Sequence, residues 1–321
     1  MAVDRRVDRR VERRTCIAGL LGLATLPFGC SRRGCNSDAG SDTHSIDTSQ
    51  IVLHQQIFDQ NQGGPQKAVV MVPAWASAEN RLPLLIALHG RGESNRGLDV
   101  GAWAWVRDYW LNRTAARLRV PPLTREDLLG IGPDSYLGQL NESLTVHPWQ
   151  GLIVVCPHTT DILSDRNLDA AAPYADFLVD HLIPKIRADF PVISTREATG
   201  IDGVSLGGRM ALLSAVNRPE AFGAVGTLQA AFRAEEVQEV ASQVKKAWQQ
   251  PVHPSALRVL TSHDDYFLPT LDKLAKALAD EPVNAQFRLI PGRHDYEFNR
   301  GPGGYEMLVW HDRVLRGGSG S

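Results

Sequence analysis

Residues 198–217 read ATGIDGVSLGGRMALLSAVN, and this stretch decides the fold. The apolar run Ala198–Val204 is typical of a buried strand, and Leu206–Asn217 is typical of an apolar helix. Between them lies GVSLG, of the form G-x-S-x-G, in which a sharp turn holds the serine in a strained backbone conformation. Strand and helix approach closely there, so glycine is needed two residues to either side. The serine hydroxyl is exposed at the helix N-terminus, where the backbone dipole favours developing negative charge. We therefore predict that Ser205 is a nucleophile and not part of an incidental glycine-rich turn.

Short apolar runs alternate with longer amphipathic ones on both sides of this turn. The predicted strands are Ile51–Phe58, Lys67–Val72, Leu84–Leu88, Leu152–Cys156, Ala198–Val204, Ala224–Leu228, Leu257–Thr261 and Gln286–Ile290. The predicted helices are Ala171–Asp189, Leu206–Asn217, Ala234–Trp248, Leu271–Asp280 and Tyr305–Leu315. Several strands are apolar at every position, as expected when helices cover both faces of a sheet. The pattern predicts an α/β protein with a mostly parallel sheet, and with the serine turn it predicts the α/β-hydrolase fold.

One long segment, from Gly92 to Gly151, separates two of these strands and is rich in tryptophan; it carries Trp103, Trp105, Tyr109, Trp110 and Trp149. An insertion of this length is often a lid or a pocket wall, and it can also be a helical subdomain with its own core. Tryptophan stacks on aryl groups and sugar faces, so Trp103 and Trp105 are candidate substrate contacts. Ordinary packing is the alternative for both.

A serine hydroxyl needs a base, which an acid orients, and in this fold the chain order is serine, acid, histidine. Four of the ten histidines follow Ser205: His253, His263, His294 and His311. His294 directly follows the last strand, where the fold requires the base. His311 falls within the last helix, His253 precedes the strand that should deliver the acid, and His263 lies in the acid's own loop.

The acid should follow the strand Leu257–Thr261, where two neighbouring carboxylates, Asp264 and Asp265, are both available. Asp265 is also a possible helix cap before Pro269. A metal site at residues 263–265 is possible, but no partner spacing such as HExxH supports it. The choice of acid stays open on these grounds.

Two backbone N–H groups should stabilise the oxyanion of the tetrahedral intermediate. One is the N–H of Leu206, directly after the nucleophile. The other should come from a loop after an early strand. The strand Leu84–Leu88 runs into HGRG at residues 89–92, a turn seen in hydrolases of this fold, which nominates the N–H of Arg91. The His89 side chain is expected to be structural.

The chain resembles the esterase D-like branch of the α/β hydrolases, which includes enterochelin esterases, S-formylglutathione hydrolases and feruloyl or acetylxylan esterases. The matching stretches are LPLLIALHGRG (82–92), FLVDHLIPKIRADFPV (177–192), GIDGVSLGGRMALLSAVNRPEAFGAVGTLQAAF (200–232) and PGRHDYEF (291–298). The resemblance implies Ser205, Asp265 and His294 as the triad, since the acid there commonly precedes a Val/Leu-Pro pair by three residues. Two features depart from the family: Gln229 stands where a serine is usual, and the Trp-rich insertion has no counterpart. Both bear on the substrate and not on the chemistry.

The composition is that of an ordinary globular protein, and a net charge of -2 gives no overall attraction to nucleic acid. Residues 1–30, with arginines followed by a short apolar run, are typical of an export signal, and Cys30 is a candidate lipidation site. The alternative is an uncleaved tail. We expect a flexible tether over 31–50, the hydrolase domain over 51–316 with its insertion at about 92–151, and a loose tail over 317–321.

These features predict an exported serine esterase, located in the periplasm or medium or attached to the envelope of a bacterium. It would act on a small-molecule or polymer-linked ester and use no cofactor and no metal. Membrane attachment would come only from an N-terminal lipid, and the oligomeric state is not encoded in any motif. A peptidase or amidase on the same scaffold and a non-catalytic binding domain are the competing hypotheses.

Overall fold

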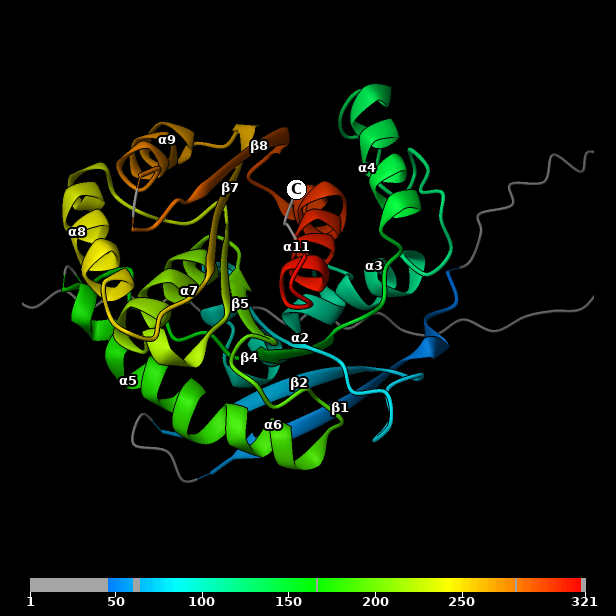
Figure 1. The fold of residues 1–321 in the computed structure, drawn as a ribbon, viewed down its shortest axis with the longest axis horizontal. Coiled ribbons are helices and arrows are strands. Elements are labelled where there is room, and N and C mark those ends of the chain that lie inside the picture. Colours follow the sequence, from blue (N-terminus) through cyan, green and yellow to red (C-terminus); the bar gives the residue numbers. More distant parts are fainter. Residues whose placement is uncertain (1–45, 60–63, 166, 281, 319–321) are drawn as a thin grey trace, which may run out of the picture. The chain divides into compact units, whose positions relative to one another are not determined.

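The computed structural model describes residues 46–59, 64–165, 167–280 and 282–318, and its centre is one eight-stranded sheet (Figure 1). The strand order is β1-β2-β4-β3-β5-β6-β7-β8. The pairs β1/β2 and β2/β4 are antiparallel, and every other neighbouring pair is parallel. The carboxyl ends of β3, β5, β7 and β8 therefore meet at one edge of the sheet, where loops carry the chemistry of open α/β folds.

The strands are β1 (Ile51–Phe58), β2 (Gln66–Pro73), β3 (Leu84–Leu88), β4 (Ile153–Pro157), β5 (Thr199–Gly203), β6 (Ala224–Leu228), β7 (Ala256–Asp264) and β8 (Gln286–Arg293). The main helices are α1 (Arg91–Ser94), α2 (Leu98–Arg107), α3 (Leu111–Arg117), α4 (Asp134–Val146), α5 (Ala172–Asp176), α6 (Ile183–Asp189), α7 (Leu206–Asn217), α8 (Val237–Trp248), α9 (Leu268–Ala277), α10 (Tyr296–Arg300) and α11 (Pro302–Val314). All eight predicted strands are present, and β7 and β8 each run three residues further than predicted. The predicted helix Ala171–Asp189 contains a π-helical stretch, Phe177–Leu182, between α5 and α6.

Helices cover both faces of the sheet, as the apolar strands predicted. Every residue of β3 and β4 is buried, because one parity faces each helical layer. One core layer combines the sheet with the segment from α5 to α9, and the other combines it with α2, α3, α4 and α11 (Figure 1). Helix α7 is buried over nearly its whole circumference, because it runs through the middle of the first layer.

The long segment between β3 and β4 folds into helices α1 to α4. Its apolar side chains, Trp105 and Leu111 among them, belong to the same core as Val154 of β4 and Trp310 of α11. The alternative of a subdomain with a separate core is therefore wrong, because these helices complete the second layer of the main core.

The described chain begins slightly before the expected domain boundary. Thr48–Gln50 form a 3-10 turn that is capped by the side chain of Asp47, and Ile46 packs against the second core layer. The expected export signal, the tether up to residue 45 and the last three residues lie outside the described residues. Within the described ranges, no helix is both long and apolar enough to cross a membrane.

Candidate active site

The serine turn has the strained geometry that the sequence predicted. Ser205 has φ 56° and ψ −114° and immediately precedes α7. A Cβ on Gly207 would lie 2.1 Å from the carbonyl oxygen of Leu88, and one on Gly203 would lie 2.5 Å from the backbone of Gly207. Both positions therefore require glycine, because β3, β5 and α7 approach one another at backbone distance.

The surrounding backbone holds Ser205 in this conformation. Its N–H donates to the carbonyl of Leu228 at the end of β6 (2.9 Å), and its carbonyl accepts from the N–H of Ala231 (2.9 Å). The preceding residue, Val204, donates to the carbonyl of Leu88 (3.0 Å). Bonds from two neighbouring strands thus maintain a backbone conformation that would otherwise relax, which is typical of functional sites.

His294 and Asp265 meet at the ends of the two last strands. The Nδ1–H of His294 donates to Oδ1 of Asp265 (2.9 Å). The Asp265 side chain is buried and also accepts bonds from the hydroxyl of Thr261 (2.6 Å) and the N–H of Phe267 (3.0 Å). All three groups donate to oxygens of the Asp265 side chain, and the proton on Nδ1 leaves Nε2 of the neutral imidazole free to act as a base.

The structure separates the two neighbouring aspartates. Asp264 is the exposed last residue of β7, while Asp265 turns into the interior after a register irregularity between Ser262 and Asp264. Bulges of this kind redirect side chains at strand ends. The geometry favours Asp265 as the partner of His294. Asp265 does not cap α9, since the residue that precedes this helix is Phe267.

The two candidate oxyanion donors lie at the first positions of two helices. Arg91 begins α1 and Leu206 begins α7, so neither N–H has a carbonyl within its own helix to bond. The turn before Arg91 lies against Ser205, because a Cβ on Gly90 would be 3.9 Å from Cβ of Ser205.

His89 holds this turn in place, as expected for a structural residue. Its Nδ1–H donates to the carbonyl of Gly90 (2.9 Å), and its Nε2 accepts from the N–H of Thr159 (2.8 Å). Burial lowers the pKa of His89 to about 3, so the ring is neutral when it makes these bonds.

A cavity of about 220 Å³ brings Ser205 and His294 together. Its lining comprises Gly90, Arg91, Gly92, Glu93, Tyr109, Val204, Ser205, Tyr266, His294, Asp295, Tyr296 and Asn299. The aromatic walls are tyrosines, and the ring of Tyr266 lies 4.4 Å from the His294 ring, centroid to centroid. Sequence reasoning missed Tyr266 and Tyr296. Their positions next to the predicted acid and two residues after the predicted base were the available signal.

The two tryptophans lie elsewhere. Trp105 is completely buried and packs edge-on against Tyr109, with centroids 4.7 Å apart. Trp103 is half-buried beneath the guanidinium of Arg107. Neither residue lines the cavity beside Ser205. Because Trp105 is fully buried, the structure favours a packing role for it over substrate contact.

Gln229, which departs from the family pattern, joins the ends of three strands. It follows β6 with φ 49°, and its Nε2 donates to the hydroxyl of Ser262 (2.6 Å) and to the carbonyl of Arg293 (2.9 Å). Arg293 directly precedes His294, so the Gln229 side chain helps to fix the loop that carries the candidate base.

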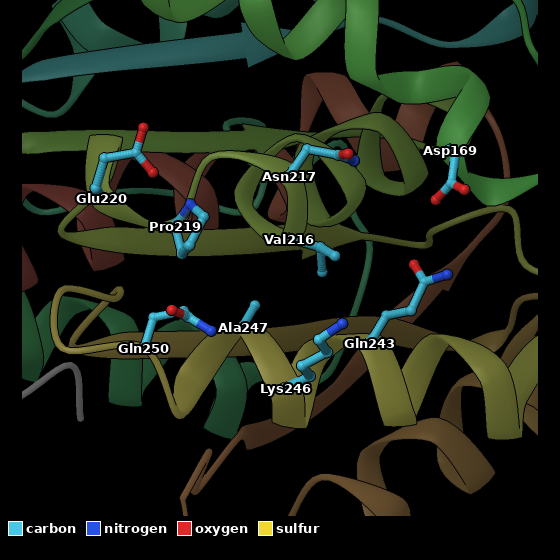
Figure 2. A pocket seen from close by; sticks show the side chains of 9 residues that line it. All are labelled: Asp169, Val216, Asn217, Pro219, Glu220, Gln243, Lys246, Ala247 and Gln250. Carbon is cyan, nitrogen blue, oxygen red and sulfur yellow. The ribbon is translucent and has the colours of Figure 1, made fainter.

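A second, larger cavity of about 460 Å³ lies between α7 and α8 (Figure 2). Its lining residues are Asp169, Val216, Asn217, Pro219, Glu220, Gln243, Lys246, Ala247 and Gln250. This lining contains no serine, cysteine or histidine. Within the described residues, no group of three or more histidine, cysteine or acidic side chains is placed to hold a metal ion, so the alternative of a metal site at residues 263–265 gains no support.

Residues 164–266 match the protein family described as "Putative esterase". The matched segment contains β5, the serine turn and α7, and it ends one residue after Asp265. The resemblance to esterases is therefore confirmed, and with it the expectation of a carboxylic-ester hydrolase. No curated protein matches the chain.

Several solved structures are similar over most of the chain. A ferulic acid esterase is 19% identical, with 83% of this chain and 99% of that chain covered and a TM-score of 0.60. An S-formylglutathione hydrolase from Staphylococcus aureus is 17% identical, with 82% and 100% covered and a TM-score of 0.57. The feruloyl esterase module from Clostridium thermocellum, complexed with sinapinate, is 13% identical, with 83% and 87% covered and a TM-score of 0.56. At these identities the likeness establishes the fold, which is the α/β-hydrolase fold that the sequence predicted.

Proposed function

We propose that this chain hydrolyses carboxylic esters through an acyl-enzyme intermediate, with Ser205 as nucleophile, His294 as general base and Asp265 as the orienting acid. The observation that carries the proposal is the hydrogen bond between His294 and the buried Asp265, at a cavity that Ser205 also lines. These groups come from loops after β5, β7 and β8 in the chain order that the fold requires.

In this mechanism Nε2 of His294 takes the proton of the Ser205 hydroxyl as its oxygen attacks the ester carbonyl. The N–H groups of Leu206 and Arg91 donate to the oxyanion that forms. The proton on His294 then passes to the departing alcohol. Water, deprotonated by the same histidine, releases the acid and restores the serine, so the cycle needs no cofactor.

The cavity bears on the substrate. A volume of about 220 Å³ and walls of Tyr109, Tyr266 and Tyr296 support a compact ester whose acyl or alcohol part has an apolar or aryl face. Two of the similar structures are a ferulic acid esterase and a feruloyl esterase module, which agrees with an aryl acyl group.

The test compares hydrolysis of p-nitrophenyl acetate and butyrate by the full chain, by Ser205→Ala and by Ser214→Ala. Ser214 is a matched control, because it lies buried on α7, the helix that follows Ser205, and its hydroxyl has no hydrogen-bond partner among the described residues. We expect Ser205→Ala to lower kcat by at least about 10³-fold and Ser214→Ala to leave it unchanged. Exclusive cleavage of aminopeptide amides would replace the ester proposal by the amidase alternative. Failure of a fluorophosphonate to label the folded chain would support a non-catalytic domain.

We also propose that the chain is exported, a proposal that depends on the sequence of residues 1–30 alone. Fractionation of a bacterial host that expresses the full chain and Cys30→Ser tests it. Release of the variant from a membrane fraction that retains the parent chain would support lipid attachment at Cys30. Recovery of both from the cytoplasm, with residues 1–30 intact, would contradict export.

A further inference from the structure

Glu93 is a buried carboxylate beside the nucleophile for which the proposed mechanism has no role. It lies on α1, two residues after Arg91, lines the same cavity as Ser205 and is only 2% exposed. A buried carboxylate is costly unless charged or hydrogen-bonding groups surround it. The partners of Glu93 therefore indicate what it contributes.

Three side chains donate to this carboxylate. The hydroxyl of Tyr109 donates to Oε2 (2.5 Å), the hydroxyl of Tyr296 donates to Oε1, and the guanidinium of Arg96 donates to Oε1 (3.3 Å). The Tyr109 hydroxyl also accepts the N–H of Gly90 (3.3 Å), the residue directly before Arg91. Glu93 thus reaches the oxyanion turn through Tyr109 as well as through its own helix.

Both tyrosines remain donors at any working pH. Burial raises the pKa of Tyr109 far above its ordinary value, and the nearby Glu93 carboxylate raises it further. Burial and the hydrogen bond to Glu93 raise the pKa of Tyr296 to about 12. A protonated hydroxyl facing an ionised carboxylate makes a strong, charge-assisted bond.

Tyr296 connects Glu93 to the other half of the site. It begins α10, two residues after His294, and is 203 positions from Glu93 in sequence. The centroids of the Tyr109 and Tyr296 rings lie 5.7 Å apart, and the two hydroxyls donate to different oxygens of the same carboxylate. One side chain therefore connects the turn that carries the Arg91 N–H to the loop that carries the base.

We propose that Glu93 is a positioning residue, which holds the Arg91 N–H and His294 in their relative places through the two tyrosine hydroxyls. The inference rests on the proposed ester hydrolysis. Removing the Glu93 carboxylate leaves Ser205, Asp265 and the cavity in place. The turn that carries the Arg91 N–H and the loop that carries His294 can then move independently. Since small misplacements of reacting groups are costly, turnover falls while ground-state binding changes little.

The experiment measures kcat and KM for p-nitrophenyl acetate, the fluorophosphonate inactivation rate and the melting temperature. The variants are Glu93→Ala, Glu93→Gln and Tyr296→Phe, with Tyr136→Phe as the matched control. Tyr136 is a buried tyrosine that donates to another buried carboxylate, Glu306 (3.1 Å), away from the cavity.

We expect Glu93→Ala to lower kcat about 30- to 100-fold with KM within about three-fold, since misplacement of reacting groups by about 1 Å costs roughly 10²-fold. Glu93→Gln keeps one acceptor oxygen, and the tyrosine hydroxyl that faces its NH₂ group can turn to accept, so this variant should recover most of the loss. Tyr296→Phe removes one of the two tyrosine bonds to Glu93 and should therefore lower kcat less than Glu93→Ala does, by about 5- to 20-fold. The inactivation rate should fall in parallel with kcat, whereas Tyr136→Phe should lower only the melting temperature.

Three results would overturn the inference. The first is a Glu93→Ala variant with kcat within two-fold of the parent chain. The second is a loss confined to KM, which would make Glu93 a substrate contact. The third, decisive if Glu93→Ala does not fold, is a Tyr296→Phe variant with unchanged kcat and inactivation rate. A parent chain that neither hydrolyses esters nor reacts with the fluorophosphonate would instead refute the proposed function, and the inference with it.

Discussion

Replacing Asp265, the proposed orienting acid, by asparagine tests the proposed mechanism, and the expected loss of activity can be worked out from the structure. In Asp265→Asn, the N–H of Phe267 requires an acceptor at the Oδ1 position, so the amide oxygen should stay there and the NH₂ group should face Thr261. The Nδ1–H of His294 would then keep its acceptor, and the imidazole would keep its tautomer. What is lost is the negative charge beside the imidazolium that forms during the reaction.

The size of this loss follows from Coulomb's law. Two unit charges about 4 Å apart interact by about 4 kcal/mol at an effective dielectric constant of about 20. A barrier higher by about 4 kcal/mol slows a reaction by roughly 10³-fold. We therefore expect Asp265→Asn to lower kcat by about 10³-fold with little change in KM, measured on p-nitrophenyl acetate.

Asp264→Asn is the matched control, because Asp264 is its exposed neighbour. Its kcat should stay within about three-fold of the parent chain, as expected for a surface substitution. The reasoning would be refuted by the reverse pattern, in which Asp264→Asn abolishes turnover and Asp265→Asn keeps most of it. Thermal unfolding of both variants shows whether either loss comes from misfolding.

Three further predictions concern stability. Gly138 lies on the exposed side of α4 with open space around it, so Gly138→Ala should raise the unfolding free energy by about 1 kcal/mol. In Gly207→Ala the new Cβ would meet the backbone of Leu88, so this variant should not fold stably. Urea titration measures both effects. Burial lowers the pKa of His89 to about 3, so the unfolded chain takes up its proton first on acidification. Stability should be complete above about pH 6.5 and fall by about 2 kcal/mol between pH 7 and pH 5 from this group alone, and a flat urea midpoint would contradict this. Trp105→Ala should cost about 3–5 kcal/mol through the cavity it leaves, and an unchanged urea midpoint would count against a packing role.

Local patterns were sufficient for the strands, most helices and the strained turn at Ser205. Strand and helix periods, and the glycines around Ser205, are properties of a few consecutive residues, so the sequence displays them directly. His294 could be chosen as the candidate base because the fold fixes the order of the triad and His294 directly follows the last strand, whereas His311 falls within the last helix.

Contacts between distant segments required the tertiary structure. The sequence left Asp264 and Asp265 as alternatives, since a single irregularity at the end of β7 decides which of two adjacent carboxylates turns inward. The sequence suggested Trp103 and Trp105 as substrate contacts because the insertion is rich in tryptophan. Packing against the sheet buries Trp105, and the aromatic residues that line the cavity are tyrosines. Glu93 and Tyr296 meet across 203 positions, and no local pattern records that pairing. A sequence shows periodicity within each element, whereas the choice of side chains that share one cavity depends on how the whole core packs.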